Sequence, residues 1–98
     1  MMIVIHTPVR PRLVRVPQDI DVLEGESSKL TCDVTSLLQA KISWSFNGAP
    51  IHHHRFKLDT DGNLLLHHVK MEDAGTYRCM ASSFFVSVAA DAQVRVFS

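Results

Sequence analysis

Short runs of alternating apolar and polar residues, separated by turn-forming residues, cover most of this chain and limit its fold more than any other feature. Successive side chains of a strand point to opposite faces, so a period of two indicates strands with one buried face. The segment "DAGTYRC" shows this period, with Gly75, Tyr77 and Cys79 on one face. Helical periodicity is nearly absent. The sequence therefore predicts an all-β domain, with strands near residues 11–16, 19–24, 28–35, 41–47, 54–59, 63–69, 75–82 and 88–97.

Turn-forming residues support these boundaries. Asn47-Gly48 and Asp61-Gly62 are dipeptides that suit the positive φ values of two-residue hairpin turns. Pro17 cannot donate to a strand ladder, so we expect the first strand to be split there or to lie at a sheet edge.

The apolar positions of the runs predict one core between two sheets, which is a β-sandwich. The positions between them are mostly polar and should face water; examples are Lys29, Thr31, Lys41, Ser43, Arg78 and Arg95. The expected core residues are Leu30, Cys32, Val34, Ile42, Trp44, Leu64, Leu66, Tyr77, Cys79, Ala81, Ala92, Val94 and Val96.

Size and charge narrow the classes of partner. The chain has 98 residues, which suits a single domain without a deep cleft between domains. Its ten basic and ten acidic residues give a formal net charge of zero, so neither nucleic acid nor an anionic membrane surface is an expected partner. No apolar run approaches the ~20 residues of a membrane span, so we expect no membrane insertion.

The sequence contains only weak signals for a metal site or a catalytic site. His52, His53 and His54 are consecutive, and consecutive side chains of an extended chain point apart, so they and the pair His67-His68 are expected to be exposed polar residues and not zinc ligands. No serine lies in a nucleophile-elbow motif, and the carboxylates lie at turns, where capping is their usual role. We expect no catalytic residue, metal or cofactor. The carboxylates in question are Asp59, Asp61, Glu72 and Asp73.

Several motifs in order identify a family resemblance. Cys32, Trp44 twelve residues later and "DAGTYRC" ending in Cys79 resemble the core signature of an immunoglobulin domain. "PRLVRVPQDIDVLEGE", "ISWSFNGAPI" and "NLLLHHVKMEDAGTYRCMAS" are similar to the corresponding strands of its intermediate class, the I-set. The resemblance implies a two-sheet antiparallel immunoglobulin-like β-sandwich over residues 11–98. Residues 1–10 are then expected to be a linker or an artificial chain start.

The resemblance also implies structural roles for individual residues. Cys32 and Cys79 would form a disulfide across the two sheets with Trp44 packed against it, or stay reduced in a cytosolic protein. Tyr77 would form a tyrosine corner, and Asp73 would pair with Arg55.

Two loops depart from the family pattern. "CMASSFFVSV" has Ser83 and Val86 where family members usually carry Asn and Gly, and "TSLLQAK" replaces a connection that is often rich in Gly and Pro. Both loops should lie at one end of the sandwich, beside the segment that precedes residue 11. Large apolar residues at loop tips indicate either a binding patch or a cap on the core of the domain itself. The candidate binding residues are Leu37, Leu38, Phe84 and Phe85.

The resemblance implies a non-catalytic protein-recognition or spacer module of a modular receptor, adhesion or matrix protein, at the cell surface or outside the cell. The alternative is a structural domain of an intracellular, muscle-type cytoskeletal scaffold. The expected partner is a protein, such as a neighbouring domain or another cell-surface or matrix protein, or a second copy of the chain in a weak homodimer.

Overall fold

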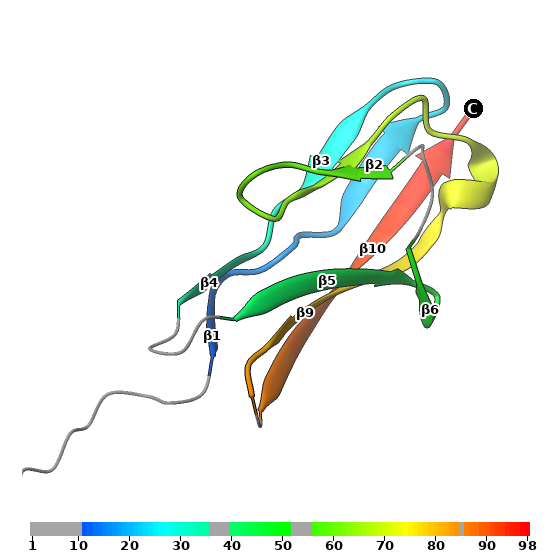
Figure 1. The fold of residues 1–98 in the computed structure, drawn as a ribbon. Helices are drawn as coiled ribbons and strands as arrows, with labels where there is room; N and C mark the ends of the chain where they lie inside the picture. Colours follow the sequence, from blue (N-terminus) through cyan, green and yellow to red (C-terminus); the bar gives the residue numbers. More distant parts are fainter. Residues whose placement is uncertain (1–10, 36–39, 52–55, 85) are drawn as a thin grey trace, which may run out of the picture.

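The computed structural model describes residues 11–35, 40–51, 56–84 and 86–98 (Figure 1). The described residues form strands of two to eleven residues and one turn of 3₁₀ helix, η1. In chain order these elements are β1 (Arg12–Arg15), β2 (Ile20–Leu23), β3 (Ser28–Leu30), β4 (Asp33–Thr35), β5 (Lys41–Phe46), β6 (Ala49–Pro50), β7 (Phe56–Leu58), β8 (Leu64–Leu66), η1 (Met71–Asp73), β9 (Gly75–Ser82) and β10 (Ser87–Phe97).

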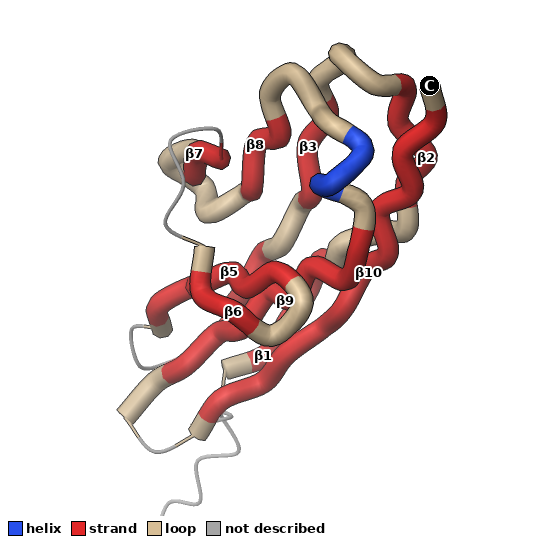
Figure 2. Tube along the Cα trace, turned by 90° about the vertical axis from the view of Figure 1, so that its right-hand side faces the viewer, coloured by secondary structure: helices blue, strands red, loops and turns tan. Residues whose placement is uncertain are grey.

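The strands form two layers that face each other (Figures 1 and 2). One layer is the five-stranded sheet β2-β10-β9-β5-β6, and the other contains the three-stranded sheet β3-β8-β7 and the pair β1-β4. Neighbouring strands are antiparallel, except that β2 runs parallel to β10. The predicted all-β sandwich is confirmed.

Pro17 marks the place where the chain changes layer. Before it, β1 pairs with β4; after it, β2 pairs with β10 in the opposite sheet. Pro17 itself is buried between them. The expected split of the first strand is confirmed, and it joins the two sheets covalently at one edge.

The prediction of one continuous strand over 28–35 was wrong, because β3 and β4 are separate. Between them, the backbone N–H of Cys32 donates to Oδ1 of Asn63 at 3.1 Å instead of to a neighbouring strand. A side chain therefore replaces one rung of the ladder, and the chain can leave β8 and join β1.

Only one of the two predicted hairpin turns has the expected form. Asn47 and Gly48 have φ values of 49° and 87° and connect β5 to β6 as a two-residue turn. The turn at Asp61-Gly62 is longer: Gly62 N–H donates to the carbonyl oxygen of Asp59 at 3.1 Å, and Asp59 N–H donates to that of Asn63 at 3.0 Å. This pattern is a three-residue loop that ends in a bulge at Gly62.

The core lies between the layers and contains the Cys32–Cys79 disulfide, whose cysteines are both 0% exposed. Val34 and Ile42 are only partly buried, contrary to expectation, because they lie near the end of the sandwich where β4 ends and β5 begins. Val22 and Val69 join the core instead. Its buried hydrophobic residues are Val22, Leu30, Cys32, Trp44, Leu64, Leu66, Val69, Tyr77, Cys79, Ala81, Ala92, Val94 and Val96.

Candidate recognition surface at the β9–β10 hairpin tip

The candidate surface is the tip of the hairpin that β9 and β10 form. Strand pairing ends at Ser82 opposite Ser87. Beyond it, the backbone N–H of Ser83 donates to the carbonyl oxygen of Val86 at 2.9 Å, and the Ser83 hydroxyl donates to the same oxygen at 3.4 Å. The turn therefore closes through the two residues that replace the family's usual Asn and Gly.

Phe84 lies at this tip with 85% of its surface exposed. The other exposed large hydrophobic residues of the described part of the chain range from 42% for Val16 to 56% for Val14 and Leu23. Full burial of a phenylalanine side chain stabilises a protein by about 1.5–3 kcal/mol relative to leaving it in water, and Phe84 does not gain this free energy in its own domain. This side chain therefore does not cap the core.

Three other strands begin or end at the end of the sandwich that carries the tip. Lys41 pairs with Ser82, and Thr35 pairs with Arg12, so the chain leaves β4 and enters β5 at the same end of the sandwich (Figures 1 and 2). β1 begins at that end as well. Three of the predicted binding residues, Leu37, Leu38 and Phe85, lie outside the described residues.

Trp44, Tyr77 and Asp73, three of the predicted structural residues, are buried in the sandwich. The Trp44 side chain is 5% exposed, and its indole N–H donates to the carbonyl oxygen of Gly62 at 2.9 Å. The Tyr77 hydroxyl donates to the carbonyl oxygen of Asp73 at 2.7 Å, which is the geometry of a tyrosine corner. Arg55 lies outside the described residues, so its pairing with Asp73 stays a prediction.

Asp73 has the capping role that is usual for a carboxylate at a turn, and the structure identifies the group that it caps. Its side chain, in a residue only 3% exposed, accepts a hydrogen bond from the backbone N–H of Lys70 at 2.8 Å and so caps η1. Lys70 is the residue before the helical turn and Asp73 lies three positions later, which is the spacing of a capping pattern.

Sequence reasoning missed the charged pairs on the outer face of the five-stranded sheet. Arg78 and Asp91 lie opposite each other on β9 and β10, with Nε to Oδ1 at 2.7 Å and Nη2 to Oδ2 at 3.1 Å. This bidentate hydrogen bonding lowers the pKa of Asp91 and raises the pKa of Arg78. Arg95 and Asp21 form a second pair at 2.7 Å between β10 and β2.

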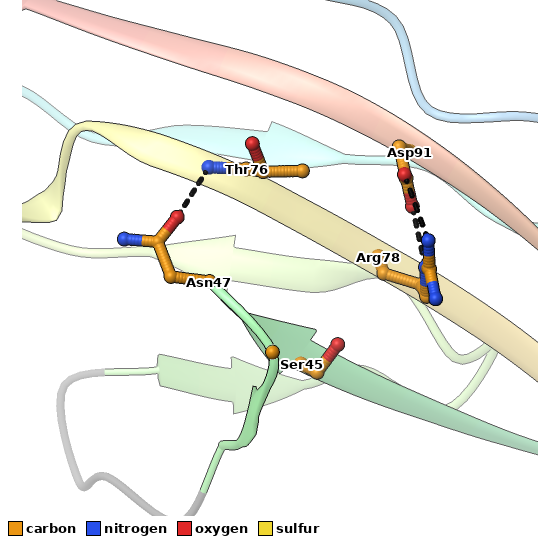
Figure 3. Close-up of a pocket in the computed structure, with 6 residues that line it drawn as sticks. Ser45, Asn47, Thr76, Arg78 and Asp91 are labelled. Atoms are coloured by element: carbon orange, nitrogen blue, oxygen red, sulfur yellow. Dashed lines mark hydrogen bonds and ion pairs between the residues drawn. The ribbon is translucent and has the colours of Figure 1, made fainter.

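The Arg78–Asp91 pair borders an open depression of about 300 Å³ (Figure 3). Two further contacts join Asn47 to Thr76. The Asn47 side-chain oxygen accepts the backbone N–H of Thr76 at 2.9 Å (Figure 3), and the backbone N–H of Asn47 donates to the carbonyl oxygen of Thr76 at 2.8 Å. Asn47, Thr76, Arg78 and Asp91 thus already bond one another across the strands. The residues that line the depression are Ser45, Asn47, Gly48, Thr76, Arg78 and Asp91.

Within the described ranges no three His, Cys, Asp or Glu side chains form a metal-binding group. His67 is partly buried and His68 is exposed, whereas His52, His53 and His54 lie outside those ranges. Asp59 is engaged in its own turn, where the hydrogen bond from the backbone N–H of Asn63 lowers its pKa. The described part of the chain has no helix suited to spanning a bilayer.

Curated relatives are long proteins of which this chain matches one small part. Papilin from Mus musculus is 35% identical over 83 residues, which are 83% of this chain and 6% of papilin. Hemicentin-1 from Homo sapiens is 32% identical over 76% of this chain and 1% of its own length. Palladin from Rattus norvegicus is 32% identical over 76% of this chain and 13% of its own length.

Solved structures agree with these sequence matches. An immunoglobulin complex of titin M10 with obscurin-like 1 contains a chain with a TM-score of 0.84 and 28% identity, over 90% of this chain and 94% of that one. The I-band fragment I67–I69 of titin gives a TM-score of 0.82 and 30% identity, over 89% of this chain and 32% of that one. The family described as "Immunoglobulin I-set domain" matches residues 11–96, so the chain belongs to the I-set of the immunoglobulin superfamily.

Proposed function

We propose that this I-set domain is a non-catalytic recognition and spacer module of a longer modular protein, and that the end carrying the β9–β10 tip makes its main protein contact. The relatives support the general class, because each contains such a domain as a small fraction of its length. The observation that carries the choice of surface is the 85% exposure of Phe84.

The direction of the chain supports the spacer role. β1 starts at the end of the sandwich that carries the β9–β10 tip, and the chain ends at the opposite end, after β10 (Figure 1). Domains attached before and after this one would therefore lie at opposite ends. A neighbour that precedes residue 11 would lie beside Phe84 and could bury it.

The remaining members of the proposed surface are Leu37, Leu38 and Phe85, together with Ile3, Val4 and Ile5 of residues 1–10. These residues are apolar in sequence, and the chain enters and leaves their segments at the same end as the tip. We assign them to one contact with a neighbouring domain or with another cell-surface or matrix protein.

The cellular compartment is linked to whether Cys32 and Cys79 are oxidised or reduced. A disulfide of this kind persists in oxidising compartments, which favours a secreted or cell-surface protein. The second candidate is a cytoskeletal scaffold, and palladin and titin among the relatives favour it. Alkylation of the two thiols in protein taken directly from its native source separates the candidates: two alkylated cysteines would support the scaffold.

The test of the proposed surface compares two exposed phenylalanines at opposite ends, Phe84 and Phe97. In the parent protein with its flanking domains, Phe84→Ser combined with Phe85→Ser should increase the motion between this domain and the one before it, as measured by small-angle scattering. Phe97→Ser, at a residue 50% exposed, is the matched control and should leave that joint unchanged. A melting temperature that falls by many degrees in the double variant would show that these side chains stabilise their own domain, and the proposal would fail.

A further inference from the structure

The long strand β10 has one edge that the described strands cover only in part. β9 pairs with it along one edge from Ser87 to Val94. β2 pairs along the other edge only from Val94 to Phe97. Among the described strands, none pairs with the β2 side of β10 between Ser87 and Gln93, and Figure 1 shows β10 running past β2 toward the hairpin tip.

Two hydrogen bonds identify the backbone groups that face this edge. Gln93 N–H donates to Oδ1 of Asp19 at 2.8 Å, and the carbonyl oxygen of Phe97 accepts from the N–H of Glu24 at 2.7 Å, both on the β2 side. Alternate residues of a strand direct their backbone groups to the same edge. The N–H and C=O groups of Ser87, Ala89 and Asp91 therefore face the open stretch.

The side chains of this stretch do little to prevent strand addition. Residues 87–91 read "SVAAD", without the lysine or proline that commonly protects a sheet edge. Serine and alanine leave room for another backbone to approach. The one charge, Asp91, is already held by Arg78 on the neighbouring strand.

We propose that this edge, residues 87–91, pairs antiparallel with the same edge of a second copy of the chain, with the twofold axis at Ala89. Ala89 then lies opposite Ala89 of the second copy, and Ser87 lies opposite Asp91 of the second copy, so no like charges face each other. Such a register forms about six backbone hydrogen bonds and joins two five-stranded sheets into one continuous sheet.

The two ends of the open stretch are placed so that a second copy can contact both of them. The stretch begins at the hairpin tip and ends where β2 joins β10 at Val94. Two copies centred on Ala89 therefore bring the tip of each to the start of β2 in the other. The exposed Phe84 of one copy approaches the β1–β2 connection of the other, which carries Val16, 42% exposed.

The first test measures association with paired lysine variants. Ser43 on β5, Met80 on β9 and Ala89 on β10 form one row across the outer face of the sheet, so Ser43→Lys is a matched control for Ala89→Lys. In sedimentation experiments from about 10 μM to about 1 mM, the parent chain and Ser43→Lys should dimerise, and Ala89→Lys should weaken dimerisation at least tenfold, or about 1.4 kcal/mol. A parent that stays monomeric throughout, or equal losses in both variants, would overturn the proposal.

The second test fixes the register. The Cα atoms of a hydrogen-bonded antiparallel pair lie about 5.5 Å apart, which is within the range of a disulfide. Ala89→Cys should therefore give a covalent dimer under mild oxidation, whereas Ser43→Cys should not. Association without cross-linking at position 89 would rule out this register. Dimerisation that is lost when residues 1–10 are removed, but that tolerates Ala89→Lys, would assign the contact to that segment instead.

Discussion

The hydroxyl of Tyr77 donates a 2.7 Å hydrogen bond to the carbonyl oxygen of Asp73, four residues earlier in the chain. Asp73 also accepts the N–H of Lys70 through its carboxylate. Asp73 thus caps η1 through its side chain and holds β9 through its carbonyl oxygen, which accepts the hydrogen bond from Tyr77. The connection between β8 and β9 is thereby fixed to the core, because the Tyr77 ring is 0% exposed.

Replacing Tyr77 with phenylalanine should remove this anchor without creating a cavity. The ring would keep its contacts with Phe46 and Phe56, at centroid distances of 4.8 and 6.0 Å. The lost hydrogen bond should lower the free energy of unfolding by about 1–2 kcal/mol. Urea unfolding measures this change, and Tyr77→Leu, which also removes ring contacts, should lose more. A Tyr77→Phe variant as stable as the parent would mean that the hydroxyl contributes nothing.

Asn63 belongs to a turn but should stabilise the region around the disulfide. Only 8% exposed, it accepts the backbone N–H of Cys32 at 3.1 Å and donates to the carboxylate of Asp59 at 3.0 Å. Asn63→Ala leaves the buried N–H of Cys32 without its acceptor, which should cost about 1–3 kcal/mol of unfolding free energy. Hydrogen exchange at Cys32 should accelerate in step with this loss. Unchanged exchange there would contradict the assigned role.

Local periodicity explains why much of the fold could be predicted. The alternation around Tyr77 and Cys79 determines which side chains point inward in any sheet that contains them, so the core could be expected without knowledge of the pairing. The exposure of Phe84 was less certain from sequence, because a residue at a loop tip can also fold back over the core. Its direction depends on how the turn between Ser83 and Val86 closes.

Long-range hydrogen bonds explain what the sequence could not reveal. The break between β3 and β4 depends on Asn63, which is 31 residues away from Cys32. The Arg78–Asp91 pair depends on the register of the hairpin, and a shift by one residue would separate the two side chains. Neither relationship has a periodic signal in the chain.

The Arg78–Asp91 pair predicts a dependence of stability on pH. The folded-state pKa of Asp91 is lowered, so the pair stabilises the fold above the unfolded pKa of about 3.9 and is lost as the pH falls through the folded value. The parent should therefore unfold at a higher urea concentration than Asp91→Asn at pH 7, and this difference should vanish in acid. About 1 M salt should shrink it at pH 7, because both side chains are partly exposed. A difference that does not vary with pH would contradict the pairing.

The disulfide should account for a large part of the stability of the domain. Cys32 and Cys79 are 47 residues apart, and closing a loop of that length stabilises the folded state by about 4 kcal/mol through the entropy of the unfolded chain. Reduction under conditions that keep the protein folded should lower the free energy of unfolding by about that amount. If the reduced protein unfolds at the same urea concentration as the oxidised one, the two thiols contribute by packing alone.

Gly75 should be the glycine least tolerant of substitution, because of the space around it and not only because of its φ of 156°. A Cβ atom there would lie 2.6 Å from Oδ1 of Asn47 and 2.7 Å from Cε1 of Phe46. The same Asn47 oxygen accepts the N–H of Thr76, so the clash would also break the contact that joins the β5–β6 turn to β9. Gly75→Ala should therefore cost about 2–4 kcal/mol. Gly25→Ala is the control, since Gly25 has a φ of 90° but no atom within 4 Å of an added Cβ, and it should cost only about 1–2 kcal/mol of backbone strain. Equal melting temperatures for the two variants would show that Asn47 moves away from the added methyl group. The contact between Asn47 and Thr76 would then not fix the β5–β6 turn to β9.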